Sequence, residues 1–246
     1  MKETIIITGA LSVTGKRLIE MMASPDRLLI GTDKAGAAWE KFKPNIPQDG
    51  FLALTDPATD LRGFHLEAWE PYCKADGAIL LAATGIVGSL TPEEVNNVNC
   101  YSQIELVKML FRNNPEKRCR VAHVNSSWGH NPKLKLPHSG YKIVADGKYQ
   151  AEQTLRNLAG RELDAGFLGH QLNVVVATVV EKTIASMLLR RAMKEGYADF
   201  VNSLPEKREV TVEKFCQGIV ASYEDPRGDQ TIFVPSEMLE PESLQS

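Results

Sequence analysis

The chain has 246 residues, 43% of them apolar, which is enough for one large core and excludes an intrinsically disordered protein. Its net charge of −3 gives no electrostatic reason to bind nucleic acid. No apolar run approaches the roughly 20 residues of a membrane-spanning helix. The first residues also lack the pattern of a signal peptide, so we expect a cytoplasmic protein.

The first predicted strand, residues 4–8, runs directly into a glycine turn, and a helix is predicted over residues 16–22. In such a strand–turn–helix unit the first glycine allows a sharp turn and the last allows close packing of helix on strand. The N-terminus of the helix then offers free N–H groups to a pyrophosphate. We therefore expect a dinucleotide to contact Gly9, Leu11, Ser12, Val13 and Gly15.

An acidic residue follows each of the next two predicted strands. Asp33 ends the strand at 28–32, 18 residues after Gly15, where a carboxylate can hold the adenosine ribose hydroxyls. Asp56 ends the strand at 51–55 and is assigned to the same nucleotide site. One short helix is predicted within residues 57–75.

The remaining elements continue the alternation of strands and helices. A fully apolar strand at 76–85 ends at Gly85, as a buried parallel strand should. Thr91 and Pro92 are strong signals for the start of a helix that runs to about Asn114. The later elements are a strand at 121–125, a long helix from about Lys148, a strand at 173–180, helical segments at 183–203 and 211–223, and a strand at 231–234. This order predicts an α/β fold, a doubly wound, Rossmann-like parallel sheet in three layers that forms a single domain over residues 1–246.

The cysteine and histidine positions do not predict a metal site. Cys73, Cys100, Cys119 and Cys216 form no Cys-x-x-Cys pair, so we expect buried thiols in a reducing compartment. We interpret His123, His130 and His138 as structural or surface residues.

Taken in order, these motifs resemble the short-chain dehydrogenase/reductase family over essentially the whole chain. Thr8-Gly9-x-x-x-Val13-x-Gly15 stands where the family has Thr-Gly-x-x-x-Gly-x-Gly. Residues 82–85 correspond to its Asn-Asn-Ala-Gly turn, which adds Ala83, Thr84 and Gly85 to the nucleotide site. The resemblance further implies that Asn99 is the structural asparagine, Ser127 the catalytic serine and Lys148 the catalytic lysine.

In that family a tyrosine four residues before the lysine transfers the proton, and the serine polarises the substrate oxygen. The lysine holds the nicotinamide ribose and lowers the tyrosine pKa, so that the phenol acts near neutral pH. Hydride then passes directly between NAD and the substrate carbon.

This chain departs from the pattern at the tyrosine. Val144 lies four residues before Lys148, and the nearest upstream tyrosine is Tyr141, seven residues away. On a continuous helix the two are about 10.5 Å apart along the axis, against about 6 Å for a four-residue step. Gly140 and Asp146-Gly147 leave open whether this segment is helical. Ala177-Thr178 also stands where the family has a Pro-Gly pair. Val13 stands where the family has a glycine, so either NAD binds despite this larger side chain or Val13 closes the site.

We therefore predict a degenerate, non-catalytic or weakly catalytic subunit of an NAD-dependent short-chain alcohol dehydrogenase. Its degeneracy is similar in kind to that of the inactive subunit of the hetero-oligomeric hydroxyacyl-coenzyme A dehydrogenase of anaerobic toluene degradation. One alternative is a self-sufficient NAD(H)-dependent alcohol/ketone oxidoreductase that uses Ser127, Lys148 and a displaced Tyr141. Another is an NAD-binding sensor without chemistry.

The resemblance also implies assembly with itself or with an intact family member through two long helices. We expect Leu106 and Leu110 on the first helix and Leu163 near the end of the second to supply apolar pairing faces, with Ala151 and Ala159 small enough to let the helices approach closely. Four basic residues lie on the segment that covers the substrate in relatives. These residues are Lys182, Arg190, Arg191 and Lys194. They either bind an anionic substrate such as an acyl-coenzyme A phosphate or form a solvated helix face.

Overall fold

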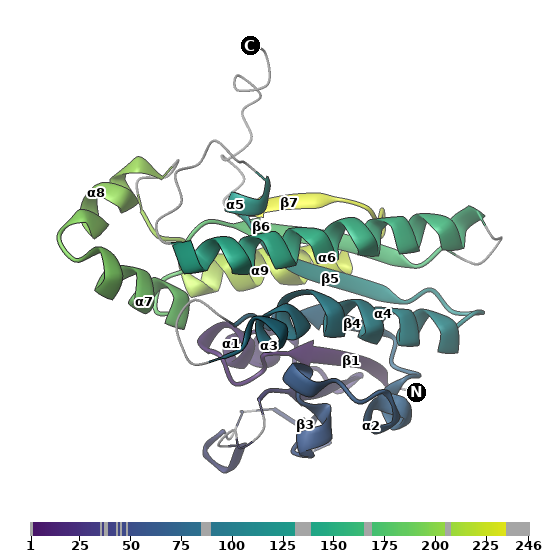
Figure 1. The fold of residues 1–246 in the computed structure, drawn as a ribbon. Helices are drawn as coiled ribbons and strands as arrows, with labels where there is room; N and C mark the ends of the chain where they lie inside the picture. Colours follow the sequence, from purple (N-terminus) through teal and green to yellow (C-terminus); the bar gives the residue numbers. More distant parts are fainter. Residues whose placement is uncertain are drawn as a thin grey trace.

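A single parallel sheet of seven strands, in the order β3-β2-β1-β4-β5-β6-β7, forms the middle layer of the computed structural model (Figure 1). The strands are β1 (Glu3–Thr8), β2 (Arg27–Thr32), β3 (Phe51–Leu54), β4 (Gly77–Leu80), β5 (Arg120–Ser126), β6 (Gln171–Ala177) and β7 (Thr231–Val234). The structure describes residues 2–34, 36, 39–42, 44, 46–47, 49–84, 90–130, 139–164, 169–204 and 208–234. The predicted α/β class and doubly wound, Rossmann-like sheet are confirmed.

Helices cover both faces of the sheet and bury its apolar side chains. One face packs against α4 (Ser102–Asn113) and α6 (Ser139–Asp164), and the other against α1 (Val13–Met22) and α9 (Val212–Glu224). The helical pair α7 (Ile184–Met193) and α8 (Gly196–Ser203) projects from one end of the molecule (Figure 1). The remaining elements are α2 (Leu66–Trp69), α3 (Pro92–Asn96), α5 (Ser127–His130), a π-helical turn (Asn97–Tyr101) and 3-10 turns at Trp39–Lys41, Pro57–Thr59, Leu61–Gly63 and Glu70–Tyr72. Among the described helices, none combines the length and apolarity needed to cross a bilayer.

Two predicted helices are broken into shorter pieces. Residues 57–75 form 3-10 turns around the four-residue α2, because Asp56 and Asp60 each accept a backbone N–H two residues ahead at 2.9 Å. The segment predicted over 183–203 divides at Lys194, whose φ of 49° ends α7.

Helix α6 begins nine residues before the predicted start. Gly140 and Gly147 therefore lie inside a continuous helix, and Tyr141 and Lys148 share it. A Cβ at Gly147 would lie 3.2 Å from the Cβ of Asn99, so this glycine allows α6 to approach the π-helical turn closely. The glycine that indicated a helix break is instead a packing residue.

The predicted pairing faces are already occupied within one chain. Leu106, Leu110 and Ala151 are fully buried and Ala159 is 8% exposed. Helix α4 packs against the sheet side, α2 and α6, which surrounds its apolar residues. The expectation that these side chains form a second, exposed face is therefore wrong. Among the described residues of this region, the exposed large apolar ones are Tyr101, Ile143 and Tyr149, which are 52%, 55% and 38% exposed.

Candidate functional site

The glycine turn after β1 has the geometry of a phosphate-binding turn. Gly9 has a φ of +69°, and a Cβ there would approach the backbone of Ala82 to 3.1 Å. A Cβ at Gly15 would lie 2.4 Å from the carbonyl oxygen of Gly9, so the turn and α1 touch without room for a side chain. Ser12 caps α1 by accepting the Gly15 N–H at 2.9 Å. Val13 is 44% exposed on the first turn and leaves this packing intact.

The two predicted acidic residues lie beside this turn. Asp33 Oδ2 accepts the N–H of Leu11 at 2.8 Å, which ties the end of β2 to the turn. A carboxylate has about four acceptor positions, so Asp33 keeps capacity for hydroxyl donors. Asp33, Trp39 and Asp56 line a common hollow of about 300 Å³ at the carboxyl ends of β2 and β3. The structure thus joins Asp33 to the turn at Leu11 and brings Asp33 and Asp56 to one hollow, and the binding of a nucleotide there stays a prediction.

The segment after β4 is held by Asn99. Its Oδ1 accepts the N–H of Thr84 at 3.1 Å, and its Nδ2 donates to the Thr84 carbonyl at 2.7 Å. Thr8 Oγ1 accepts the N–H groups of Leu81 and Ala82 at 3.0 Å, which joins this segment to β1. Asn99 is completely buried and makes backbone bonds, as the resemblance implies for a structural residue. Ala83 lies between these anchors, and Gly85 falls outside the described residues.

Tyr141 pairs with Ser126, whereas Ser127 was expected. Ser126 Oγ donates to Tyr141 Oη over 3.4 Å, while the buried Ser127 Oγ has no hydrogen-bond partner among the described residues. The Tyr141 ring meets the edge of the Trp128 ring at 4.9 Å. Burial raises the pKa of the Tyr141 phenol, and the Ser126 hydrogen bond is the opposing influence.

Lys148 lies apart from this pair. Its Nζ donates to the Val124 carbonyl at 3.0 Å, and burial lowers its pKa to about 7. Along the continuous helix it is about 10.5 Å from Tyr141. The residue four positions after Tyr141, at the spacing that the family gives its lysine, is Ala145, which is 2% exposed.

The Ser126–Tyr141 contact also permits a second match to the family pattern. Aligned on Tyr141, the chain keeps the tyrosine and lacks the lysine, whereas alignment on Lys148 left Val144 at the tyrosine position. The spacing from Tyr141 to Ala145 is visible in the sequence and was the signal available for this alternative.

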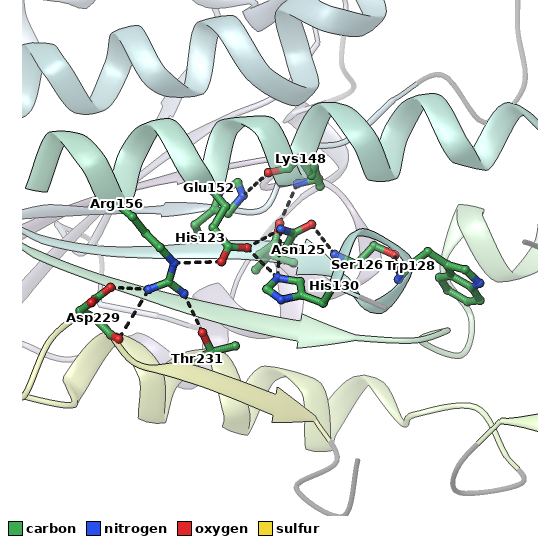
Figure 2. Close-up of polar contacts among 11 residues, drawn as sticks. His123, Asn125, Ser126, Trp128, His130, Lys148, Glu152, Arg156, Asp229 and Thr231 are labelled. Atoms are coloured by element: carbon green, nitrogen blue, oxygen red, sulfur yellow. Dashed lines mark hydrogen bonds and ion pairs between the residues drawn. The ribbon is translucent and has the colours of Figure 1, made fainter. Parts of the chain in front are cut away.

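Sequence reasoning missed a buried carboxylate, Glu152, on the sheet-facing side of α6 (Figure 2). Its two oxygens accept from Asn125 Nδ2 at 2.6 Å and Arg156 Nε at 2.9 Å, and His130 Nε2 lies 2.7 Å away. Burial raises its pKa, but these three partners together lower it to about 2. Arg156 continues the network to Thr231 Oγ1 at 2.6 Å, so Glu152 connects α6 with β5, α5 and β7.

The histidines make structural contacts where the structure describes them. His123 is fully buried with Nε2 3.2 Å from the Lys148 carbonyl, and burial lowers its pKa to about 3. His138 lies outside the described residues. The four cysteines are buried and free, as predicted. Within the described ranges, no three His, Cys, Asp or Glu side chains gather as metal ligands would.

Aromatic side chains cover the Ser126–Tyr141 pair. Trp128 packs between Tyr141 and Phe200 of α8, with a centroid distance of 6.0 Å to Phe200. On the outer side of this region Arg190 pairs with Glu209 at 3.1 Å, and Lys182 with Glu181 at 3.5 Å. Arg191 and Lys194 are exposed, and a role of these cations in anion binding remains a prediction.

No protein-family model and no curated protein matches the chain. Levodione reductase has a similar structure, with a TM-score of 0.70 and 15% identity over 96% of this chain and 97% of that chain. A short-chain dehydrogenase from Leptospira borgpetersenii serovar Hardjo-bovis with bound NAD+ gives 0.71 and 15% over 96% and 92%. A 3-oxoacyl-(acyl-carrier-protein) reductase from Agrobacterium tumefaciens C58 with NADP bound gives 0.70 and 18% over 94% and 92%. At these identities the similarity establishes the architecture: the chain has the fold of the short-chain dehydrogenases/reductases.

Proposed function

We propose that this chain is a degenerate, non-catalytic or weakly catalytic subunit of an NAD-dependent short-chain alcohol dehydrogenase, with hydroxyacyl-coenzyme A esters as one candidate substrate class. The observation that carries the proposal is Ala145. It lies one helical turn after the buried Tyr141–Ser126 pair, where the family's chemistry requires an amine.

The physical reason is that Tyr141 cannot readily release its proton. A phenol transfers its proton near neutral pH only if a nearby cation stabilises the phenolate. Burial instead raises the pKa of Tyr141, and Lys148 is bound to the Val124 carbonyl two turns away. When bound, NAD would supply the hydride acceptor, but a Tyr141 that keeps its proton cannot accept the proton of the substrate hydroxyl.

The nucleotide half supports NAD as the cofactor. Gly9 and Gly15 shape the turn, and Asp33, which accepts the Leu11 N–H of that turn, would also accept ribose hydroxyls. A carboxylate at this position repels the 2′-phosphate of NADP. The free, buried cysteines support the expected reducing, cytoplasmic compartment.

The proposal includes assembly with itself or with an intact family member. Tyr101 and Ile143, rather than the buried residues of α4 and α6, offer exposed apolar area for it. Light scattering on the chain alone and with an intact homologue tests this point. A complex that Ile143→Glu weakens supports it, and strictly monomeric behaviour in both samples contradicts it.

The catalytic claim is tested by turnover. The purified chain is assayed with NAD+ and a panel of secondary alcohols and hydroxyacyl thioesters, beside Tyr141→Phe and Ala145→Lys, with circular dichroism to verify folding. We expect wild type to match the Tyr141→Phe background, and Ala145→Lys to rise above it. Turnover of wild type at ordinary enzyme rates that Tyr141→Phe abolishes would contradict the proposal.

A self-sufficient oxidoreductase is the second candidate, and the Ser126–Tyr141 contact favours it. The two hydroxyls lie 3.4 Å apart, so both reach one substrate oxygen if α8 moves away. In that case Ser126→Ala lowers kcat while Ser127→Ala leaves it unchanged.

A further inference from the structure

The two halves of the candidate site differ in access. In the half that would face a nicotinamide, Ser126, Tyr141 and Lys148 are 5%, 7% and 4% exposed. Trp128 packs on the tyrosine ring, and Phe200 packs on the ring of Trp128. A side chain can contact a ligand only if the ligand can reach it. In this half of the site, aromatic packing encloses the side chains that would contact the nicotinamide.

The half beside the glycine turn is open. Its hollow of about 300 Å³ exposes Asp56 and Lys34 and is walled by the partly exposed Trp39. The Trp39 ring is supported from behind by Phe51, at a centroid distance of 6.0 Å, and Phe51 in turn meets Phe42 edge-on at 5.6 Å. A supported indole on one wall and carboxylates on the others suit a flat, uncharged group that carries hydroxyl and amino donors.

From this contrast, and resting on the proposed NAD site, we infer that the chain binds the adenosine diphosphate half of a dinucleotide, with Trp39 as the stacking wall, and does not sense the nicotinamide. NAD+, NADH and ADP-ribose therefore bind alike. The chain is a redox-blind adenine-nucleotide binder, because the residues that would distinguish the two nicotinamide states are enclosed.

Calorimetric titration with the three ligands measures the first part. We expect their dissociation constants to agree within about threefold. Trp39→Ala should weaken all three about tenfold or more, because base stacking on an aromatic side chain is lost. Trp39→Phe, which keeps a ring against Phe51, and Lys41→Ala, on the exposed side of the same 3-10 turn, serve as controls and should bind nearly as wild type.

Tryptophan fluorescence during an ADP-ribose titration locates the site. The signal change should persist in Trp128→Phe and disappear in Trp39→Phe. NADH binding about tenfold tighter than ADP-ribose, or a signal that survives Trp39→Phe, overturns the inference while leaving an NAD site in place. Binding of none of the three ligands overturns both the inference and the proposed cofactor.

Discussion

Replacing Glu152 by glutamine should remove much of the stability that the folded chain gains from the hydrogen bonds and ion pairs of this buried carboxylate. Lowering the pKa of this carboxyl from 4.5 to about 2 corresponds to about 3 kcal/mol, at about 1.4 kcal/mol for each pKa unit. Glutamine keeps the size of the side chain but removes the buried anion beside Arg156 and His130, and Arg156 then keeps only its pair with the exposed Asp229 among the described residues. We therefore expect Glu152→Gln to lower the free energy of unfolding by about 3 kcal/mol at pH 7.

Asp146→Asn is the matched control on the same helix. Asp146 is 61% exposed and pairs only with the exposed Lys142, so its loss should cost less than about 0.5 kcal/mol. Urea unfolding at constant m-value measures both variants. The folded-state pKa of Glu152 is lowered, so its contribution is present above about pH 4.5 and is lost as the pH falls toward 2. A Glu152→Gln variant as stable as Asp146→Asn at pH 7, or a difference that grows on acidification, would refute the reasoning.

Two further predictions concern the nucleotide half. Gly15→Ala should destabilise the chain by at least about 3 kcal/mol, because its Cβ would meet a backbone oxygen at 2.4 Å. Gly160→Ala, with nothing within 4 Å of the added methyl group, should stabilise it by about 1 kcal/mol, and thermal unfolding compares the two. Calorimetry should show that NAD binds at least about tenfold tighter than NADP. Asp33→Asn should reduce this difference in affinity. Equal affinities of the wild-type chain for NAD and NADP would contradict the role of Asp33.

The fold was predictable because its signals are local, and the prediction of a nucleotide site rests on signals of the same kind. A β-branched run predicts a strand, a glycine predicts a turn, and an acidic residue marks the end of the next strand. Each of these signals lies within a few residues of the feature that it predicts. The doubly wound parallel sheet followed from the alternation of strands and helices, whereas the order of its strands comes from the structure. The short turns within 57–75 were missed because capping by Asp56 and Asp60 competes with a continuous helix, and the periodicity there is weak.

The contacts of the catalytic half could not be predicted in detail because they join distant residues. Gly147 indicated a helix break, yet it allows α6 to approach Asn99, 48 residues earlier in the chain. Which of two consecutive serines faces Tyr141 depends on where β5 ends and α5 begins. The burial of the Glu152 carboxylate is explained only by its hydrogen bond with Asn125, which lies 27 residues earlier in the chain. The apolar residues of α4 were interpreted as two faces, although a helix enclosed on several sides is apolar around much of its circumference.

The central claim is that Tyr141 is not activated, and the most direct test is the ionisation of its phenol. Ultraviolet difference absorbance between wild type and Tyr141→Phe, recorded from pH 6 to 11, isolates this one phenolate and needs no knowledge of the substrate. Because burial raises the pKa of Tyr141 above its ordinary value of 10.0, the difference spectrum should show no phenolate throughout the neutral range. A phenolate that appears with a midpoint near pH 7 would show an activated tyrosine and contradict the account.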